Sequence, residues 1–113
     1  MDATQRHRRR VAIARRFARR LRADLGPAVK RVTLYGSVAR GEDRRGSDVD
    51  LLVEVRRRTA ALEARVYSAV TEVSIEDGEL LVPIVVSQAE ARRKLSRSFL
   101  ENVRREGVVL VRR

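Results

Sequence analysis

Two apolar runs separated by a short polar segment constrain the fold of this chain more than any other feature. The first run covers residues 30–35 and is followed at once by Gly36-Ser37. The second run begins with Asp48-Val49-Asp50 and continues to residue 55. β-branched and aromatic residues favour strands, and a near-continuous apolar run is typical of a strand covered on both faces. So short a connection predicts two strands that pair in an antiparallel or offset manner.

Helical periodicity and capping signals predict the remaining elements. We expect helices over residues ~2–25, ~59–74 and ~98–106, a short helix that opens at Ser87, and a single helical turn at 38–40. Two further strands are expected at residues 79–86 and 108–111. Capping boxes are predicted at Asp2/Gln5, Ser87/Glu90 and Ser98/Glu101, and Gly107 is predicted to end the last helix in the left-handed conformation. The pattern indicates a small α/β (α+β) domain with a mixed β-sheet flanked by helices.

Size and composition limit what this domain can be. The chain has 113 residues, which is enough for one domain, residues 1–113, with one modest core. The sequence has no apolar run of about 18 residues, so we expect no membrane span. It has no cysteine, which excludes disulfides, thiol catalysis and cysteine-bound zinc. These features predict a cytoplasmic protein.

The strongly basic charge balance leaves two interpretations open. The net charge is +11, which favours an anionic partner such as nucleic acid, a nucleotide or an acidic protein. The basic residues are spread along the chain, so they are equally well explained as ordinary solvated faces. The arginines of the first helix could contact RNA, but more often such a face is simply the wet side of a packed helix. His7 has no evident partner in the sequence, and we expect it at the surface.

Gly36-Ser37 is the first half of a predicted site. A glycine directly after a strand lets the backbone turn tightly and approach a ligand closely. If Ser37 opens a helical turn, its free N–H groups and its hydroxyl suit a phosphate, and Arg40 one turn later adds positive charge. Taken alone, a strand followed by Gly-Ser is usually no more than a turn.

Asp48 and Asp50 form the second half. Residues i and i+2 of a strand lie on one face, about 6–7 Å apart. Aspartate is depleted in strands, so two of them on one face require an explanation. Carboxylates placed in this way can hold divalent metal ions. The alternative is that Asp48 belongs to the preceding turn and Asp50 is an edge residue.

Together, the two halves resemble the signature of the DNA polymerase beta-like nucleotidyltransferase superfamily. Gly36-Ser37, ten residues and Asp48-Val49-Asp50 match its motif, and the size and element order are similar to those of its minimal members. The resemblance implies the nucleotidyltransferase fold. It also implies that Gly36 and Ser37 bind the triphosphate of ATP or another nucleotide, that Asp48 and Asp50 hold two magnesium ions, and that a nucleotidyl group is transferred to a hydroxyl with release of pyrophosphate. Arg40 is added to the nucleotide-binding residues by its position one turn after Ser37.

One part of the family pattern is not visible. Active members carry a third carboxylate on a later strand, beside the pair. The corresponding strand here contains no acid, and Pro83 stands about where that carboxylate is expected. Glu79 at the strand's entrance and Asp77 in the turn before it are the candidate substitutes, whereas Glu54 shares the face of Asp50 but is displaced along its strand. This departure bears on binding of the second metal and on activation of the hydroxyl, and not on the fold.

The resemblance also implies a partner. Minimal members are typically encoded beside a small helical toxin of the HEPN class, and some of them silence that toxin by adenylylating a tyrosine. The first hypothesis is therefore an antitoxin enzyme that uses Mg²⁺ and ATP. The second is a catalytically impaired module that neutralises its partner by docking, and a third is an RNA-binding accessory protein. A homo- or hetero-oligomer is compatible with all three.

Overall fold

The computed structural model describes residues 1–112, and these residues form four strands and five α-helices. The strands are β1 (Val29–Tyr35), β2 (Val49–Val55), β3 (Leu81–Ser87) and β4 (Val108–Arg112). The helices are α1 (Ala3–Leu25), α2 (Gly36–Arg40), α3 (Ala60–Asp77), α4 (Gln88–Lys94) and α5 (Arg97–Glu106), with a 3₁₀ turn, η1 (Gly26–Ala28), before β1.

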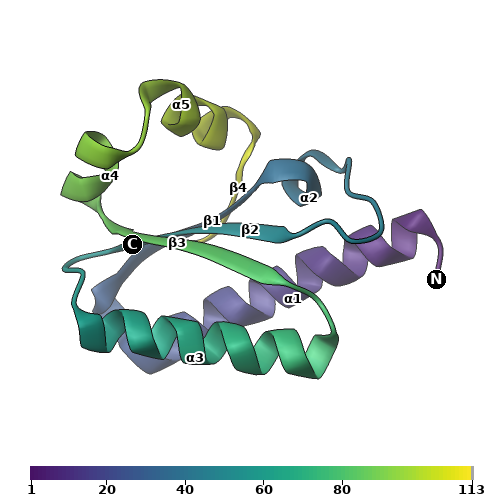
Figure 1. Ribbon diagram of the computed structural model, residues 1–113, viewed down its shortest axis with the longest axis horizontal. Coiled ribbons are helices and arrows are strands. Elements are labelled where there is room, and N and C mark those ends of the chain that lie inside the picture. Colours follow the sequence, from purple (N-terminus) through teal and green to yellow (C-terminus); the bar gives the residue numbers. More distant parts are fainter. Residues whose placement is uncertain (113) are drawn as a thin grey trace.

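The strands form one mixed sheet in the order β3-β2-β1-β4 (Figure 1). β1 is antiparallel to both of its neighbours, β2 and β4, as the short connection between β1 and β2 predicts. β2 and β3 are parallel, and α3 supplies the crossover that a parallel pair requires. Both the mixed sheet and the α+β class expected from the sequence are confirmed.

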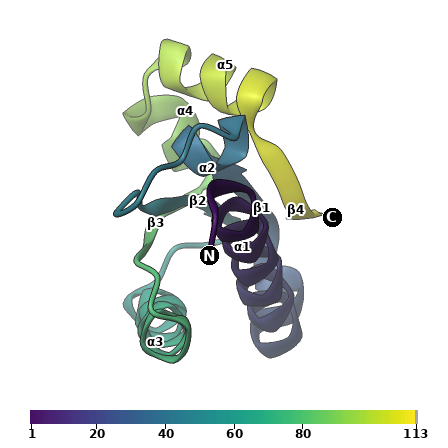
Figure 2. The same ribbon diagram turned by 90° about the vertical axis from the view of Figure 1, so that its right-hand side faces the viewer.

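Helices cover both faces of the sheet (Figure 2). α1 and α3 pack on one face, where Phe17 and Leu21 meet Leu34, Leu51 and Val53 in a fully buried core. α4 and α5 pack on the other face, and a smaller apolar cluster forms there. Its buried members are Leu52, Val86, Ala91 and Val103. Because strand side chains alternate between faces, Asp50 and Leu52 belong to the face that α4 and α5 cover.

Three helix ends differ from the sequence expectation. α5 is capped by Ser96, whose hydroxyl accepts the N–H of Phe99 at 3.0 Å, and not by Ser98. Gly107 is extended, with φ −74°, so the predicted left-handed cap is wrong. A side chain at Gly107 would instead approach Thr33 of β1, which explains the glycine by packing. α3 continues to Asp77 and ends at Gly78, further than predicted.

The other capping signals are confirmed. The Asp2 carboxylate accepts the N–H of Gln5 at 2.8 Å, and the Gln5 side chain accepts the N–H of Asp2 at 2.9 Å. Ser87 and Glu90 form the same reciprocal pair at the start of α4. Within residues 1–112, no helix has the length and apolar content needed to cross a membrane.

Candidate active site

Gly36 brings the backbone directly against a carboxylate. It follows Tyr35, the last residue of β1, and its φ of 77° turns the chain into α2. A Cβ at this position would lie only 2.4 Å from Oδ2 of Asp50. A side chain here would be strained by the positive φ and would also have to displace the Asp50 carboxylate on the neighbouring strand. The structure thus brings together the two halves of the sequence motif.

Asp50 lies in β2 directly opposite Tyr35 of β1. Burial raises the pKa of its carboxyl, the negative charge of Asp48 raises that pKa further, and the positive charge of Arg40 opposes the shift. Burial also raises the pKa of the Tyr35 phenol to about 12, with the charge of Asp50 acting in the same direction. The ionised carboxylate of Asp50 is therefore disfavoured both by burial and by the nearby negative charge of Asp48. A bound cation would offset both effects.

Asp48 lies just outside the strand. The sequence predicted a strand from Asp48 onward, but β2 begins at Val49, so Asp48 is exposed in the connecting loop. The strand begins at Val49, whose N–H donates to the carbonyl of Leu80 at 2.9 Å. Asp48 is near enough to Asp50 to raise the pKa of the Asp50 carboxyl, although Asp48 itself lies in the loop and not in the sheet.

Ser37 and Arg40 lie in α2, the single short helix predicted after Gly36. Ser37 is half-buried, and its carbonyl closes the turn by accepting the N–H of Glu42 at 2.9 Å. Arg40 is already engaged: its Nε lies 3.2 Å from Glu42 and its Nη1 lies 3.6 Å from Glu106. The pairing with Glu42 raises the pKa of the Arg40 guanidinium. Arg40 must therefore exchange these carboxylates for phosphate if it is to contact a nucleotide.

The strand beside Asp50 carries no third carboxylate. In the parallel register, Asp50 pairs with Val82 and Leu52 pairs with Ile84, so these apolar residues share the face of Asp50. Pro83 pairs with Leu51 and lies on the opposite face. The expectation that Pro83 occupies the position of the third acid is therefore wrong by one residue, because a one-residue change of register reverses the face.

The acids considered as substitutes have other partners. Glu79 bonds to Arg9 and Arg10 of α1, each at 3.0 Å, and Asp77 pairs with Arg16. Glu54 lies on the face of Asp50, as predicted, but it is four residues further along β2 and is 3.9 Å from Arg31. Across residues 1–112, no three His, Cys, Asp or Glu side chains gather in a metal-binding arrangement.

A cavity of about 240 Å³ adjoins Gly36, and sequence reasoning did not find it. α5 provides its far wall through Phe99, Asn102 and Glu106. The rings of Phe99 and Tyr35 meet edge to face, with centroids 5.2 Å apart. Only the packing of α5 across β1 brings residues 99–106 to Gly36, and no local pattern signals a contact over that separation. The tail of the chain thus contributes a wall beside the predicted phosphate-binding turn.

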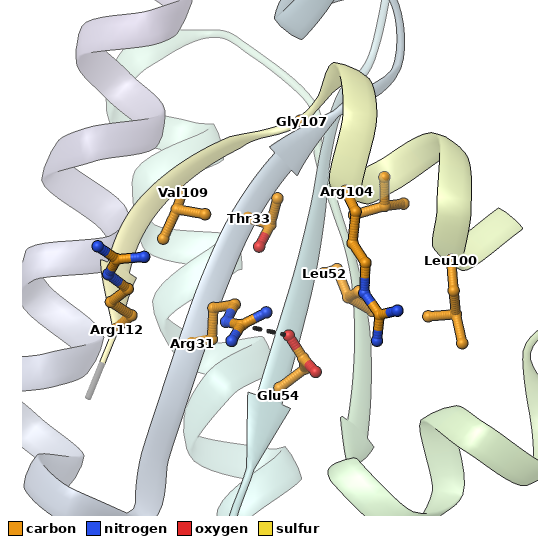
Figure 3. Close-up of a pocket in the computed structure, with 10 residues that line it drawn as sticks. Arg31, Thr33, Leu52, Glu54, Leu100, Arg104, Gly107, Val109 and Arg112 are labelled. Carbon is orange, nitrogen blue, oxygen red and sulfur yellow. Dashed lines mark ion pairs between the residues drawn. The ribbon is translucent and has the colours of Figure 1, made fainter.

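A second cavity lies on the same face of the sheet (Figure 3). Its volume is about 180 Å³, and it is lined by Arg31, Arg104 and Arg112 together with Glu54. Arg104 and Leu100 of α5 line this cavity, whereas Phe99 and Asn102 line the first, so the two cavities lie along different flanks of α5. None of the predicted site residues borders the second cavity.

His7 is not the isolated surface residue that the sequence suggested. Its Nδ1 lies 2.8 Å from Oδ1 of Asp43, in the loop between α2 and β2. The carboxylate of Asp43 also accepts from Arg10 of α1 at 2.8 Å. These hydrogen bonds, with His7 contributing most, hold the pKa of the Asp43 carboxyl below its usual range although burial alone would raise it. Partners 33 and 36 residues away have no signature in the sequence.

The comparisons with known proteins identify the family. The model of the nucleotidyltransferase domain family matches residues 14–106, most of the chain. The chain belongs to this family. A solved structure provisionally described as a minimal nucleotidyltransferase is 31% identical, with a TM-score of 0.59, and the match covers 96% of this chain and 95% of that one. No curated protein sequence matches.

Two more distant structures share the fold. A chain of a toxin–antitoxin complex with AMP-PNP has a TM-score of 0.63 at 17% identity, and the match covers 88% of this chain and 73% of that one. A chain of the complex between the tri-AMPylated Shewanella oneidensis HEPN toxin and the MNT antitoxin has a TM-score of 0.57 at 14% identity, with coverages of 90% and 72%. The nucleotidyltransferase fold expected from the motif is therefore confirmed.

Proposed function

We propose that this nucleotidyltransferase-family protein transfers a nucleotidyl group from ATP to a hydroxyl of a partner protein. The observation that carries the proposal is the contact between Gly36 and Asp50. It joins a turn that can face phosphates to a carboxylate that can hold a cation. Gly36 and Arg40 also line the cavity of about 240 Å³. Phosphate groups and a divalent cation are the two ligands that such an arrangement serves together.

The donor set fits magnesium in the company of a triphosphate. Mg²⁺ is commonly held by one or two carboxylates, with substrate phosphates and water completing its shell. Asp48 and Asp50 supply that number, and the raised pKa of Asp50 reflects their mutual repulsion as well as burial. When bound, the metal would offset charge on the departing pyrophosphate and favour ionisation of the attacking hydroxyl. A second ion has weaker support, because Val82 and Ile84 stand where a third acid is expected.

The chain's own groups then have separate tasks. The backbone N–H groups at Gly36 and Ser37 hold the phosphates, and the Ser37 hydroxyl adds a donor. Arg40 leaves Glu42 and Glu106 to neutralise phosphate charge. Phosphoryl-type transfer depends mainly on such positioning and charge stabilisation, and little covalent chemistry is required of the protein.

The partner that we propose is a HEPN-type protein, with this chain as its antitoxin. The support comes from fold neighbours, of which one is a complex of a tri-AMPylated HEPN toxin with an MNT antitoxin. AMPylation of a toxin is nucleotidyl transfer to a protein, the reaction proposed here. The role of this chain toward its own partner is part of the proposal.

Docking without transfer is the second candidate function. The absence of an acid at Val82 and Ile84 favours it, and the cavity lined by Arg31, Arg104 and Arg112 provides a basic surface apart from the nucleotide site. RNA binding has less support, since Arg9, Arg10, Arg16 and Arg20 of α1 are paired with carboxylates of the same chain.

Transfer of label tests the first proposal against the second. The chain is incubated with the protein encoded beside it, Mg²⁺ and ATP labelled at the α-phosphate. We expect label on the partner, and a loss of about 100-fold or more in Asp48→Asn and Asp50→Asn. Asp24→Asn, at the exposed end of α1, is the matched control and should transfer normally. A stable complex with the partner but no transfer of label would overturn the enzymatic proposal and support docking without transfer.

A further inference from the structure

Arg10 is a buried arginine that connects three segments of the chain. It lies in α1 and only 3% of its surface is exposed. Its Nη1 donates to Oδ2 of Asp43 at 2.8 Å and to the carbonyl of Arg44 at 2.7 Å, and its Nε donates to Oε2 of Glu79 at 3.0 Å. These bonds outweigh the effect of burial and raise the pKa of the guanidinium, which therefore keeps its charge inside the protein.

Two of these partners belong to the loop that leads to Asp48. Asp43 and Arg44 lie between α2, which carries the phosphate-binding turn, and β2, which begins after Asp48. The side chain of Asp43 is 1% exposed, and its second oxygen is bonded to His7. Arg10 of α1 thus binds both a side chain and a backbone carbonyl of the loop. Because the Asp43 carboxylate is buried, water could not replace Arg10 if its side chain were removed.

Hydrogen bonds also link Arg44 to Ser47, the residue directly before Asp48. The N–H of Ser47 donates to the Arg44 carbonyl at 3.1 Å, and the Ser47 hydroxyl accepts the N–H of Arg44 at 2.8 Å. The same carbonyl is the one that Arg10 holds. Asp48 follows this closed turn immediately, and its exposed side chain has no recorded hydrogen bond within residues 1–112.

We propose that Arg10 is a positioning residue that sets the location of the Asp48 carboxylate through Asp43 and the 44–47 turn. The inference rests on the proposed function, because it assigns Asp48 to a metal site. Arg10 also holds Glu79, whose neighbour Leu80 accepts the N–H of Val49. The Arg10 guanidinium therefore binds on two sides of the start of β2. On one side it holds the loop before Asp48, and on the other it holds Glu79, the residue before Leu80.

A structural role alone is a weaker account of this arrangement. Burying a charged group requires desolvation, and replacing a buried ion pair by apolar side chains often leaves stability unchanged or improves it. The cluster converges on the loop before Asp48, which a role in stability alone does not require. Side chains that orient metal ligands from behind typically change metal affinity 10–100-fold when they are mutated.

Direct metal binding separates the two roles. Binding of Mn²⁺, used as a probe for Mg²⁺, is measured for the whole chain by calorimetry, and binding of AMP-PNP is measured separately in the absence of metal. We expect Arg10→Met to weaken Mn²⁺ binding about ten-fold. Metal-free AMP-PNP binding should not change, because Arg10 does not contact Gly36 or Ser37. A purely structural defect would lower both affinities.

Arg16→Met is the matched control. Arg16 lies on the same helix and pairs with Asp77 near the start of β3, but it does not contact residues 41–48. It should bind Mn²⁺ as the wild type does. Arg10→Lys keeps the charge but lacks the fork that serves three acceptors, and it should give an intermediate affinity. If Arg10→Met does not fold, Asp43→Asn, which weakens the same link, replaces it with the same expected direction.

The outcomes distinguish this inference from the proposed function. Equal Mn²⁺ affinity in the wild type and in Arg10→Met would overturn the positioning role and leave the metal site intact. A parallel loss in Arg10→Met and Arg16→Met would also overturn it, because Arg10 bonds to the loop and Arg16 does not. Absence of Mn²⁺ binding in the wild type would instead remove the proposed metal site itself.

Discussion

Gly36 and Gly41 have similar positive φ angles in very different surroundings. Their φ angles are 77° and 71°. A Cβ at Gly36 would press on the carboxylate of Asp50, whereas a Cβ at Gly41 would meet nothing within 4 Å. The sequence predicted a glycine-dependent turn at 36, but its spacing could not show that Asp50 fills the space that a side chain would need. At the scale of the residue, this contact defines the candidate site.

Alanine substitutions at Gly36 and Gly41 separate the effect of backbone strain from the effect of displacing the Asp50 carboxylate. Gly41→Ala should lower the free energy of unfolding by about 1–2 kcal/mol, the usual cost of a left-handed L-residue. Gly36→Ala should lower it further and should also weaken metal-dependent AMP-PNP binding, because Asp50 must move. Urea unfolding and nucleotide titration measure the two effects. Equal behaviour of the two variants would show that the Asp50 contact has no role in binding.

Release of Arg40 should strengthen nucleotide binding. Glu106 lies 3.6 Å from Arg40 and competes with any phosphate for its guanidinium. Exposed pairs of this kind are weak, so Glu106→Gln should raise AMP-PNP affinity modestly, by up to about five-fold. Glu101→Gln, which removes a pair with Arg97 on the same helix, should leave the affinity unchanged. Unaltered binding in Glu106→Gln would argue that Arg40 does not contact the nucleotide.

The raised pKa of Asp50 gives a pH-dependent prediction for the metal-free protein. A carboxyl whose pKa is higher in the folded state destabilises the fold once it is ionised. Asp50→Asn should therefore raise the Tm at pH 7 by a few degrees, and this gain should disappear as the pH falls below the ordinary aspartate value of 3.8. Asp24→Asn serves as the exposed control. A gain that persists unchanged at pH 3 would contradict the assignment.

At the scale of the element, α5 shows where sequence patterns succeed and where they fail. Its existence and its glycine boundary were predicted, but the N-cap was expected at Ser98 and lies at Ser96. The contact of Phe99 with Tyr35 and the cavity wall beside Gly36 join residues that are far apart in the sequence, and no local pattern signals them. β2 shows the same limit, because its apolar run is plain in the sequence whereas its start at Val49, one residue after Asp48, is not.

The two serines provide a matched pair of variants. Ser96→Ala removes the side-chain oxygen that accepts the N–H of Phe99, so it should lower the free energy of unfolding by about 1 kcal/mol. Ser98 is exposed and has no recorded hydrogen bond within the described part of the chain, so Ser98→Ala should change stability little. Chemical denaturation compares them. A larger effect at Ser98 would restore the cap that the sequence suggested.

At the scale of the whole molecule, the sequence was most informative about the order of strands and helices and least informative about which charged side chains pair with one another. Strand and helix order, sheet type and family follow from periodicity and one motif, because these signals are local. The ion pairs that join α1 to Asp43, Asp77 and Glu79 span 33 to 70 residues, and nothing in the sequence predicts them. They engage arginines that composition alone assigned to solvent or to RNA. In the structure, several arginines of α1 therefore form ion pairs with carboxylates of the same chain.

The central claim is that Gly36, Ser37, Asp48 and Asp50 form one site for a nucleotide and its metal. The most direct test is the affinity for AMP-PNP with and without Mg²⁺ in the wild type, Asp48→Asn and Asp50→Asn. We predict that Mg²⁺ raises the affinity of the wild type about ten-fold or more and that both variants lose this gain. An equal gain from Mg²⁺ in all three proteins would contradict the claim, as would a wild type whose affinity does not respond to Mg²⁺.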